Sequence, residues 1–383
     1  MEGSVRKRGK TWYYRFRDRD GKQIERVAGK TKKEALVKLN EELSRFNSGI
    51  DRPNEVALSK YLMFWLEEYI KPPLKSTNTY DKYKRDIALR IIPSIGNVRL
   101  CDLKVYHIEK FVKDCRKVKK ENGELVSNTT VQKYYGVLNS ALNRAVKLQL
   151  IIDNPCKNVD TPKRSKYIAS VLSLEEYKMI YNDLDSTKYN DYIFKLALNI
   201  TVETGLRRGE MCGLCWEDVD FVNSTISINK ALKREKNVYV IGDTKTHTSR
   251  IIPISNSLAD QLKKHKNYQN ILKLRYGSLY IENIFDDKKY NLIFTKECGE
   301  YIIPSRFLQR LKRRCNYYNI NKNIRWHDLR HTNATLLIKQ GVNMKIIQER
   351  LGHAQFSTTA DIYSHVTQDM NRDTTQKLIE ILK

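Results

Sequence analysis

This 383-residue sequence has no long hydrophobic run, and it has far fewer acidic than basic residues. No stretch approaches the about 20 consecutive apolar residues of a membrane-spanning helix, and residues 1–10 hold no apolar run of the kind that signal peptides carry. Cysteine is scarce and odd in number, with seven residues scattered over the chain. We therefore expect no membrane association and no disulfide framework, and the thiols are predicted to be reduced, as in a cytoplasm.

The shortage of acidic groups leaves a large positive charge. Asp and Glu total 44 against 70 Lys and Arg, which gives a net charge of +26. Such a charge favours a polyanionic partner, most simply nucleic acid, because neutralised phosphates release their counterions. A merely basic, ribosome-like protein is the alternative on charge alone. The length predicts two or three domains, and 40% apolar residues suffice for their cores.

The first 50 residues contain a pattern typical of a small sheet with one helix. Residues 10–17 alternate between two faces as a half-buried strand does, residues 18–21 predict a turn, and residues 23–28 predict the returning strand. Thr31 and Glu34 form a capping box ahead of a helix. The apolar face of the first strand carries Trp12, Tyr14 and Phe16. The other face carries the residues predicted to bind nucleic acid, with an ordinary solvated sheet as the alternative: Tyr13, Arg15 and Arg17.

The middle of the chain is predicted to be all-helical. Prolines and glycines at 72–73, 93–96 and 122–123 separate four helical patterns, and residues 51–55 and 154–165 resemble polar linkers that contain proline. The four helices are expected at residues 61–69, 79–91, 105–118 and 128–148.

The last part mixes helices with short strands. Helices are expected at residues 174–184, 192–204, 305–318, 326–340, 344–350, 358–366 and 373–382. Strands are expected at residues 225–229, 238–241 and 250–254. The whole chain is therefore predicted to contain three domains, at residues 1–50, 54–160 and 166–383.

His327, Arg330 and His331 lie near the start of one predicted helix. Residues three apart project from the same helix face, and a helix N-terminus favours an anion. The two histidines are four apart, which is also a zinc-ligand spacing, so a zinc site is an alternative. The zinc-protease pattern has Glu where this chain has Asp328, and an arginine among the ligands disfavours a cation. We therefore expect no metal.

Three further segments supply reactive groups. A turn that opens a helix is predicted to place Arg207 and Glu210 on one face. Lys245 lies between two predicted strands and is expected at the tip of a hairpin. His353 follows the end of a predicted helix, and Tyr363 lies on the next one.

Together these groups suit the cleavage of a phosphodiester. Two arginines can bind the non-bridging oxygens of one phosphate by bidentate, charge-assisted hydrogen bonds. A tyrosine, with an ordinary pKa of about 10, can act as the nucleophile in a cationic surrounding. Lysine or histidine can protonate the leaving oxygen, and arginines stabilise the charge of the transition state, so no cofactor is required.

Four motifs and their order resemble the tyrosine recombinases, also called phage-type integrases: T-G-L-R at 204–207, H-x-L-R-H-T at 327–332, L-G-H at 351–353 and a late Tyr363, with a lysine between the first two. The resemblance covers most of the chain and implies the multidomain tyrosine recombinase fold. That fold would comprise a small N-terminal β-sheet plus helix that binds arm-type DNA, an all-α core-binding domain, and a mainly α catalytic domain with a small β-sheet. It also implies a 3′-phosphotyrosine intermediate, which allows ligation without ATP.

The resemblance implies a role for each candidate residue. Arg207 and Arg330 would bind the phosphate. Lys245 would protonate the 5′-oxygen, with Lys233 and Lys236 as alternatives. The remaining implied roles are support of the first arginine by Glu210, proton handling and positioning by His327 and His353, and nucleophilic attack by Tyr363.

The implied function is integration, and excision, of a mobile element such as a phage or transposon. The implied partners are double-stranded DNA at core and arm sites and a homotetramer that passes through a Holliday junction, with each C-terminal segment docked in trans. An excisionase and a host DNA-bending protein would assist. We expect a cytoplasmic, nucleoid-associated bacterial enzyme. The alternatives are a type IB topoisomerase, a chromosome-dimer-resolving recombinase without the arm-binding domain, and a DNA-binding regulator without catalysis.

Overall fold

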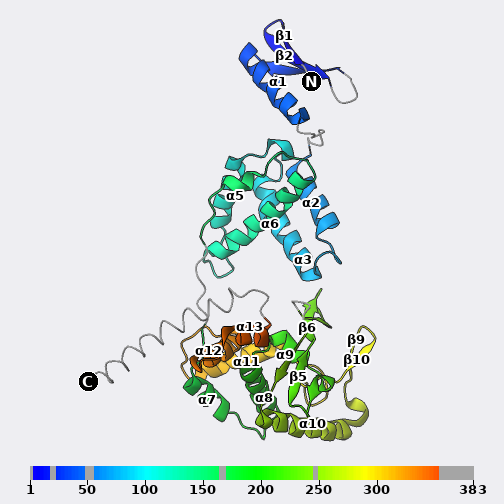
Figure 1. Cartoon of the computed structure of the whole chain (residues 1–383), viewed down its shortest axis with the longest axis vertical. Helices are drawn as coiled ribbons and strands as arrows, with labels where there is room; N and C mark the ends of the chain where they lie inside the picture. Colours follow the sequence, from blue (N-terminus) through cyan, green and yellow to red (C-terminus); the bar gives the residue numbers. More distant parts are fainter. Residues whose placement is uncertain (1–2, 18–22, 48–55, 164–169, 245–248, 353–383) are drawn as a thin grey trace, which may run out of the picture. The chain divides into compact units, whose positions relative to one another are not determined.

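The structure, a computed structural model, describes residues 3–17, 23–47, 56–163, 170–244 and 249–352 (Figure 1). The chain divides into two compact units, Met1–Lys166 and Tyr167–Lys383. The turn predicted at 18–21, the first linker, and the helices predicted at 358–366 and 373–382 lie outside the described residues.

The N-terminal sheet has three antiparallel strands in the order β1-β2-β3, and helix α1 packs against all three (Figure 1). The elements are β1 (Gly3–Arg8), β2 (Thr11–Arg17), β3 (Gln23–Gly29) and α1 (Lys32–Asn47). β1 is absent from the sequence-based prediction because Val5 is its one apolar residue, so no alternation marks it. The ladder with β2 holds β1, and Arg6 Nη2 donates to Oε2 of Glu25 on β3 at 2.6 Å. The capping box is confirmed, since the N–H of Glu34 donates to Oγ1 of Thr31 at 3.2 Å.

The two faces of β2 differ as the alternation predicts. Tyr14 and Phe16 are buried with Ala35 and Leu39 of α1, and these four residues form the centre of a small core. The opposite face presents the predicted nucleic-acid-binding residues: half-buried Tyr13, half-buried Arg15 and exposed Arg17. The sheet therefore has one apolar and one basic face.

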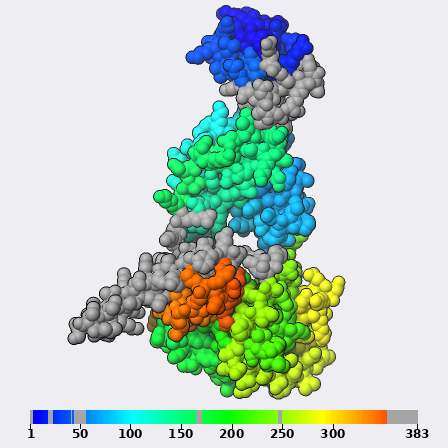
Figure 2. All heavy atoms as spheres, viewed as in Figure 1, coloured from blue at the N-terminus to red at the C-terminus, as the bar shows by residue number. Residues whose placement is uncertain are grey.

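The next stretch folds as helices around a core of its own. Its four longer helices are α2 (Leu58–Tyr69), α3 (Thr77–Asp86), α5 (Val105–Arg116) and α6 (Asn128–Lys147). They correspond to the four predicted helices, with ends shifted by a few residues. Their apolar faces bury Trp65, Phe111 and Leu142. The space-filling view shows the outer surface of this stretch, coloured from blue through cyan to green along the chain (Figure 2).

The helix break predicted at residues 93–96 starts too early, because residues 93–95 are still helical. The chain continues from α3 through a π-helical turn, η1 (Ile87–Ile91), into α4 (Ile92–Ile95), and Pro93 is a helical residue. Proline has no N–H to donate to the fourth residue before it, so a helix of regular pitch would be interrupted there. In the wider turn the N–H of Ile92 donates to the carbonyl of Ile87, five residues back, which accommodates the proline. The helix ends at Gly96 instead.

The predicted second linker also begins too early. Asn154 is fully buried, and its side-chain amide donates to Oδ1 of Asn139 at 2.7 Å and of Asn143 at 2.8 Å. Cys156, in the short helix η3 (Pro155–Asn158), is buried in the same core. A polar residue at 154 therefore marks an internal hydrogen-bonding site and not a solvated linker.

The second unit surrounds a core in which Phe194, Phe307 and Trp326 pack together. Its helices are α7 (Leu174–Asn182), α8 (Tyr189–Thr204), α9 (Arg208–Cys212), α10 (Asn256–Tyr276), α11 (Pro304–Tyr317), α12 (Trp326–Lys339) and α13 (Met344–Leu351). Three of its strands form a sheet in the order β4 (Val219–Asp220), β5 (Thr225–Ile228), β8 (Arg250–Pro253). The other strands form two-stranded antiparallel pairs. One pair is β6 (Lys230–Glu235) and β7 (Val238–Asp243), and the other is β9 (Asn283–Phe285) and β10 (Lys288–Tyr290). None of the described helices is long and apolar enough to cross a membrane.

The longest of the described helices of this unit, α10, is missing from the sequence-based prediction. Its buried face includes two polar residues, His265 and Gln269, which interrupt the apolar period that would identify a helix. Both form hydrogen bonds inside the unit. Nε2 of His265 lies 2.8 Å from the carbonyl of Ile293, and Nε2 of Gln269 donates to Oγ1 of Thr295 at 2.8 Å. Nε1 of Trp216 donates to Oε1 of Gln269 at 2.7 Å.

Gln269→Ala should destabilise the second unit, because it leaves the indole N–H of Trp216 and the hydroxyl of Thr295 without their buried partner. We expect the free energy of unfolding to fall by about 1–3 kcal/mol, measured by urea unfolding with circular dichroism. Asn270→Ala is the matched control, since Asn270 is the exposed neighbouring amide and should change stability by about 0.5 kcal/mol or less. Equal effects of the two substitutions would contradict this account of α10.

Candidate active site

Arg207 and Glu210 are joined where α8 gives way to α9. Gly205 ends α8 with a positive φ of 68°, and a Cβ there would lie 2.3 Å from Cδ2 of Leu351, so the tight turn requires glycine. Arg207 then caps α9. Its N–H donates to Oε2 of Glu210 at 3.0 Å, and its Nη1 donates to Oε1 at 2.7 Å. The predicted turn and the shared helix face are both present.

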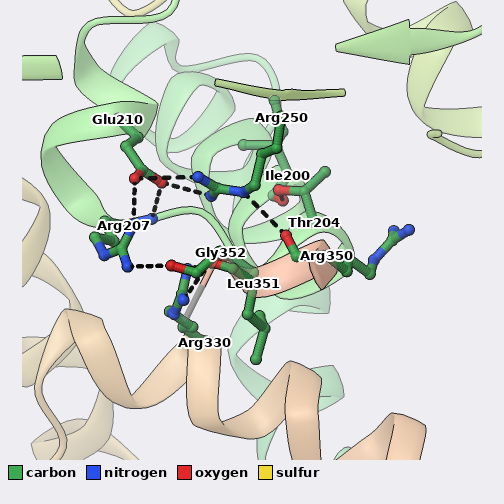
Figure 3. A network of polar contacts seen from close by, with 10 residues as sticks. Ile200, Thr204, Arg207, Glu210, Arg250, Arg330, Arg350, Leu351 and Gly352 are labelled. Carbon is green, nitrogen blue, oxygen red and sulfur yellow. Dashed lines mark hydrogen bonds and ion pairs between the residues drawn. The ribbon is translucent and has the colours of Figure 1, made fainter. Parts of the chain in front are cut away.

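Arg330 reaches the same place from α12, as Figure 3 shows. Its Nη1 donates to the carbonyl of Gly205 at 2.9 Å and its Nη2 donates to the carbonyl of Leu351. Nη2 of Arg207 donates to the next carbonyl, that of Gly352, at 2.8 Å. Arg330 is 1% exposed, and its Nε has no hydrogen-bond partner among the described residues. The two arginines therefore converge on adjacent carbonyls at the end of α13.

A third arginine, Arg250, belongs to this site although no sequence motif identified it. Its Nη2 donates to Oε2 of Glu210 at 2.7 Å, its Nη1 donates to Oε1 at 3.3 Å, and its Nε donates to the carbonyl of Arg350 at 3.0 Å (Figure 3). Its side chain is 10% exposed. The one sequence signal for it is that Arg250 is the only charged residue of an otherwise apolar predicted strand.

Glu210 supplies the negative charge of this arrangement, and its side chain is 1% exposed. Burial alone would raise the pKa of Glu210, but the hydrogen bond and charge of Arg250, and then those of Arg207, lower that pKa to about 2. Burial and the charges of the other two arginines lower the pKa of Arg330 well below its ordinary value. Three guanidinium groups around one carboxylate leave a site suited to an additional anion such as phosphate.

His327 lies at the start of α12, close enough to Arg330 and Arg207 for their charges to act on its ring. Its ring centroid is 5.1 Å from that of His331, and the two rings are nearly perpendicular. Desolvation, followed by the charges of His331, Arg330 and Arg207, lowers the pKa of His327 to about 4. The imidazole is therefore neutral near pH 7 in the protein without DNA.

The residue between the histidines does not support a zinc site. Oδ2 of Asp328 accepts the N–H of Arg325 at 2.8 Å, and its Oδ1 accepts Nη2 of the same arginine at 2.9 Å. The carboxylate thus caps α12. Within the described ranges, no group of three or more His, Cys, Asp and Glu residues could hold a metal ion.

Three predicted catalytic residues, Lys245, His353 and Tyr363, lie outside the described residues. The expectation of a hairpin with Lys245 at its tip is wrong. β7, before the lysine, pairs with β6, whereas β8, after it, pairs with β5. The actual hairpin turn contains Lys236 and Asn237, both with positive φ. The error arose because β6, rich in charged residues, does not have an apolar strand pattern.

Comparison with known proteins finds a matching protein family in each of the two units. Residues 170–370 match the phage integrase family, and residues 57–115 match the phage integrase N-terminal SAM-like domain. The chain is 32% identical to a XerC-like tyrosine recombinase of Caldanaerobacter subterraneus subsp. tengcongensis, over 92% of each chain. It is 31% identical to the integrase of Staphylococcus phage L54a, over 83% of this chain and 91% of that one.

The structural comparison confirms the predicted fold class. The integrase of transposon Tn1549, solved in complex with a circular intermediate DNA, superposes with a TM-score of 0.68 at 21% sequence identity. The match covers 84% of this chain and 99% of that chain.

The ring of His327 should titrate well below its ordinary pKa. Because the folded pKa of about 4 lies below the about 6.5 of an unfolded histidine, stability falls as the pH drops from about 6.5 through about 4. NMR of carbon-13-labelled histidine measures the pKa directly, and His327→Gln identifies the signal among the seven histidines. A His327 pKa at or above about 6.5 in the DNA-free protein would contradict the desolvation of this ring next to the arginines.

Proposed function

The chain belongs to the phage integrase family of tyrosine recombinases, and from that premise we propose that Arg207 and Arg330 bind the phosphate at which it cuts DNA. The enzyme is a site-specific DNA recombinase that cuts and rejoins DNA strands. The observation that carries the proposal is the convergence of both guanidinium groups on the adjacent carbonyls of Leu351 and Gly352. The non-bridging oxygens of a phosphate are closely spaced acceptors of the same kind, with the added attraction of charge.

In this proposal the phenolic oxygen of Tyr363 attacks the phosphorus, and the bond from phosphorus to the 5′-oxygen breaks. Lys245 gives that oxygen its proton, and His327 and His353 handle the proton of the phenol and position the phosphate. The 3′-phosphotyrosine keeps the energy of the broken ester. A 5′-hydroxyl from a second duplex can therefore reverse the step without ATP.

The electrostatics of the described residues support these roles. Negative charge that builds on the phosphate in the transition state lies beside guanidinium groups that are already oriented. Glu210, with its pKa of about 2, stays ionised and keeps Arg207 in place over the working pH range. A phosphate next to His327 would raise the pKa of that ring from about 4 towards neutrality, where an acid or base is most effective.

We also propose that the basic face of β2 binds the arm-type DNA site. Nε of Arg15 donates to Oγ of Ser4 at 2.7 Å, and the guanidinium of Arg8 lies 5.9 Å from the ring centre of Tyr13. Arginine and tyrosine side chains held on one sheet face can contact phosphates and bases together with Arg17. A domain of this kind is typical of mobile-element integrases and favours them over chromosome-dimer-resolving recombinases.

DNA is the partner of this enzyme, and we propose that four copies assemble on two duplexes. The segment after Tyr363 would dock on a neighbouring copy, since its apolar residues are too few for a core of their own: Leu378, Ile379, Ile381 and Leu382. An excisionase and a host DNA-bending protein would set the direction of the reaction. We propose that the enzyme acts on the nucleoid, in the bacterial cytoplasm, where its DNA substrate lies.

Tyr363→Phe should abolish the covalent protein–DNA adduct and leave DNA binding unchanged, because phenylalanine lacks the attacking oxygen. A nicked suicide duplex traps the adduct, which a denaturing gel detects. Tyr317→Phe is the matched control, since Tyr317 is 70% exposed on α11 and should retain the wild-type yield. A normal adduct from Tyr363→Phe would mean that another residue is the nucleophile.

The same preparations separate recombination from strand relaxation. Wild-type protein given two duplexes of different length should produce exchanged strands, also in excess EDTA, since the proposed chemistry uses no metal. Relaxation of supercoiled DNA without strand exchange would indicate topoisomerase activity instead, and a strict metal requirement would contradict the proposed set of residues.

A further inference from the structure

We propose that Arg250 is a positioning residue for DNA cleavage, which holds Glu210 and the end of α13 in the places from which they orient Arg207. The proposal rests on the proposed function and adds a residue that lies outside the recognised motifs. Arg250 acts through its neighbours and has no need to contact DNA.

The first part of the argument is the contact with Glu210. Arg250 binds both oxygens of this carboxylate, with Nη2 at 2.7 Å from Oε2 and Nη1 at 3.3 Å from Oε1. The same two oxygens accept the N–H and Nη1 of Arg207. A carboxylate held on both oxygens by one planar guanidinium cannot rotate freely. The orientation of Glu210, and with it that of Arg207, is therefore set by Arg250.

The second part is the contact with α13. Nε of Arg250 donates to the carbonyl of Arg350 at 3.0 Å. Gly352 has a positive φ of 64°, and a Cβ there would lie 3.2 Å from both Cδ and Nη1 of Arg250. Its backbone therefore packs directly against the Arg250 side chain. The guanidinium of Arg207 has two acceptors, the carboxylate of Glu210 and the carbonyl of Gly352. Arg250 is in contact with both residues.

The backbone of Arg250 is held in place by strand pairing. It is the first residue of β8 and pairs with Ile228 of β5 in an antiparallel ladder. The next inward-facing residue, Ile252, is 1% exposed. β8 directly follows the connection that carries Lys245. One side chain on a paired strand thus contacts both Glu210 and the end of α13, and strands hold a site more accurately than loops do.

The electrostatics provide a readout specific to this role. The charged groups that face Glu210 are Arg207, which caps α9, Arg250 from β8 and Arg330 from α12. Without Arg250 the carboxylate loses its strongest opposing partner while staying buried, so the pKa of Glu210 rises. Protonation at acid pH would then release Arg207. The cleavage rate would therefore fall at acid pH, and we call this fall the acid limb of the rate profile. A substitution that only loosened the fold would not introduce it.

The test is a double-mutant cycle between Arg250→Ala and Glu210→Gln, together with Arg250→Lys. The rate of adduct formation on the nicked suicide duplex is measured from about pH 5 to about pH 8 at saturating protein. DNA binding is followed by fluorescence anisotropy, and folding by thermal melting. Arg275→Ala, which removes an exposed arginine of α10, is the matched control and should behave as the wild type.

We expect Arg250→Ala to slow cleavage by about 100-fold near pH 7 without weakening DNA binding, and by more at acid pH. Arg250→Lys keeps the positive charge but loses the planar guanidinium with its paired N–H donors. Its cleavage rate should lie between those of Arg250→Ala and the wild type. The double variant should be no slower than the slower single variant and should lack the acid limb, because both changes disable one unit.

Additive losses in the double variant, or a loss that is the same at every pH, would overturn the proposal. If Arg250→Ala fails to fold, the cycle of Arg250→Lys with Glu210→Gln decides by additivity alone, since lysine keeps the charge that sets the pKa of Glu210. Failure of the wild type and Arg275→Ala to form any adduct would refute the proposed function itself, which is a different outcome from failure of the Arg250 proposal.

Discussion

One buried carboxylate allows three arginines to share a site. Arg207, Arg250 and Arg330 bring positive charges together where little water screens their repulsion. Glu210 accepts hydrogen bonds from two of them and stays ionised, because their charges outweigh the cost of its burial. Removing one partner of a buried ion pair typically costs about 3–5 kcal/mol. The arrangement of arginines on which the proposed phosphate binding depends therefore requires the negative charge of Glu210.

The main chain completes the arrangement that Glu210 begins. The ends of two helices from distant parts of the sequence, α8 and α13, meet at glycines whose positive φ lets the chain turn away. Gly205 and Leu351 offer their carbonyls to Arg330, and Gly352 offers its carbonyl to Arg207. Loss of either turn would move acceptors and arginines together. In sequence, α13 is followed by His353 and Tyr363, so the proposed phosphate site and the proposed nucleophile are close together along the chain.

Local chemistry made part of this site predictable from the sequence. Arg207 and Glu210 are three residues apart at a helix start, a spacing that fixes a shared face whatever the rest of the fold does. The role of Arg250 could not be inferred in this way, because its partners come from two other segments that only tertiary packing brings together. Helix α10 was missed for a related reason, since His265 and Gln269 are buried against polar partners far away in sequence.

The most direct test of a charge-based phosphate site changes the charge on the DNA. A duplex with a methylphosphonate at the cleavage position lacks one negative oxygen there, while the rest of the substrate is unchanged. If the arginines act on that charge, Arg330→Ala slows cleavage strongly on the phosphate duplex and far less on the methylphosphonate duplex. An equal loss on the two substrates would contradict the account, because Arg330 would then serve the fold and not the phosphate.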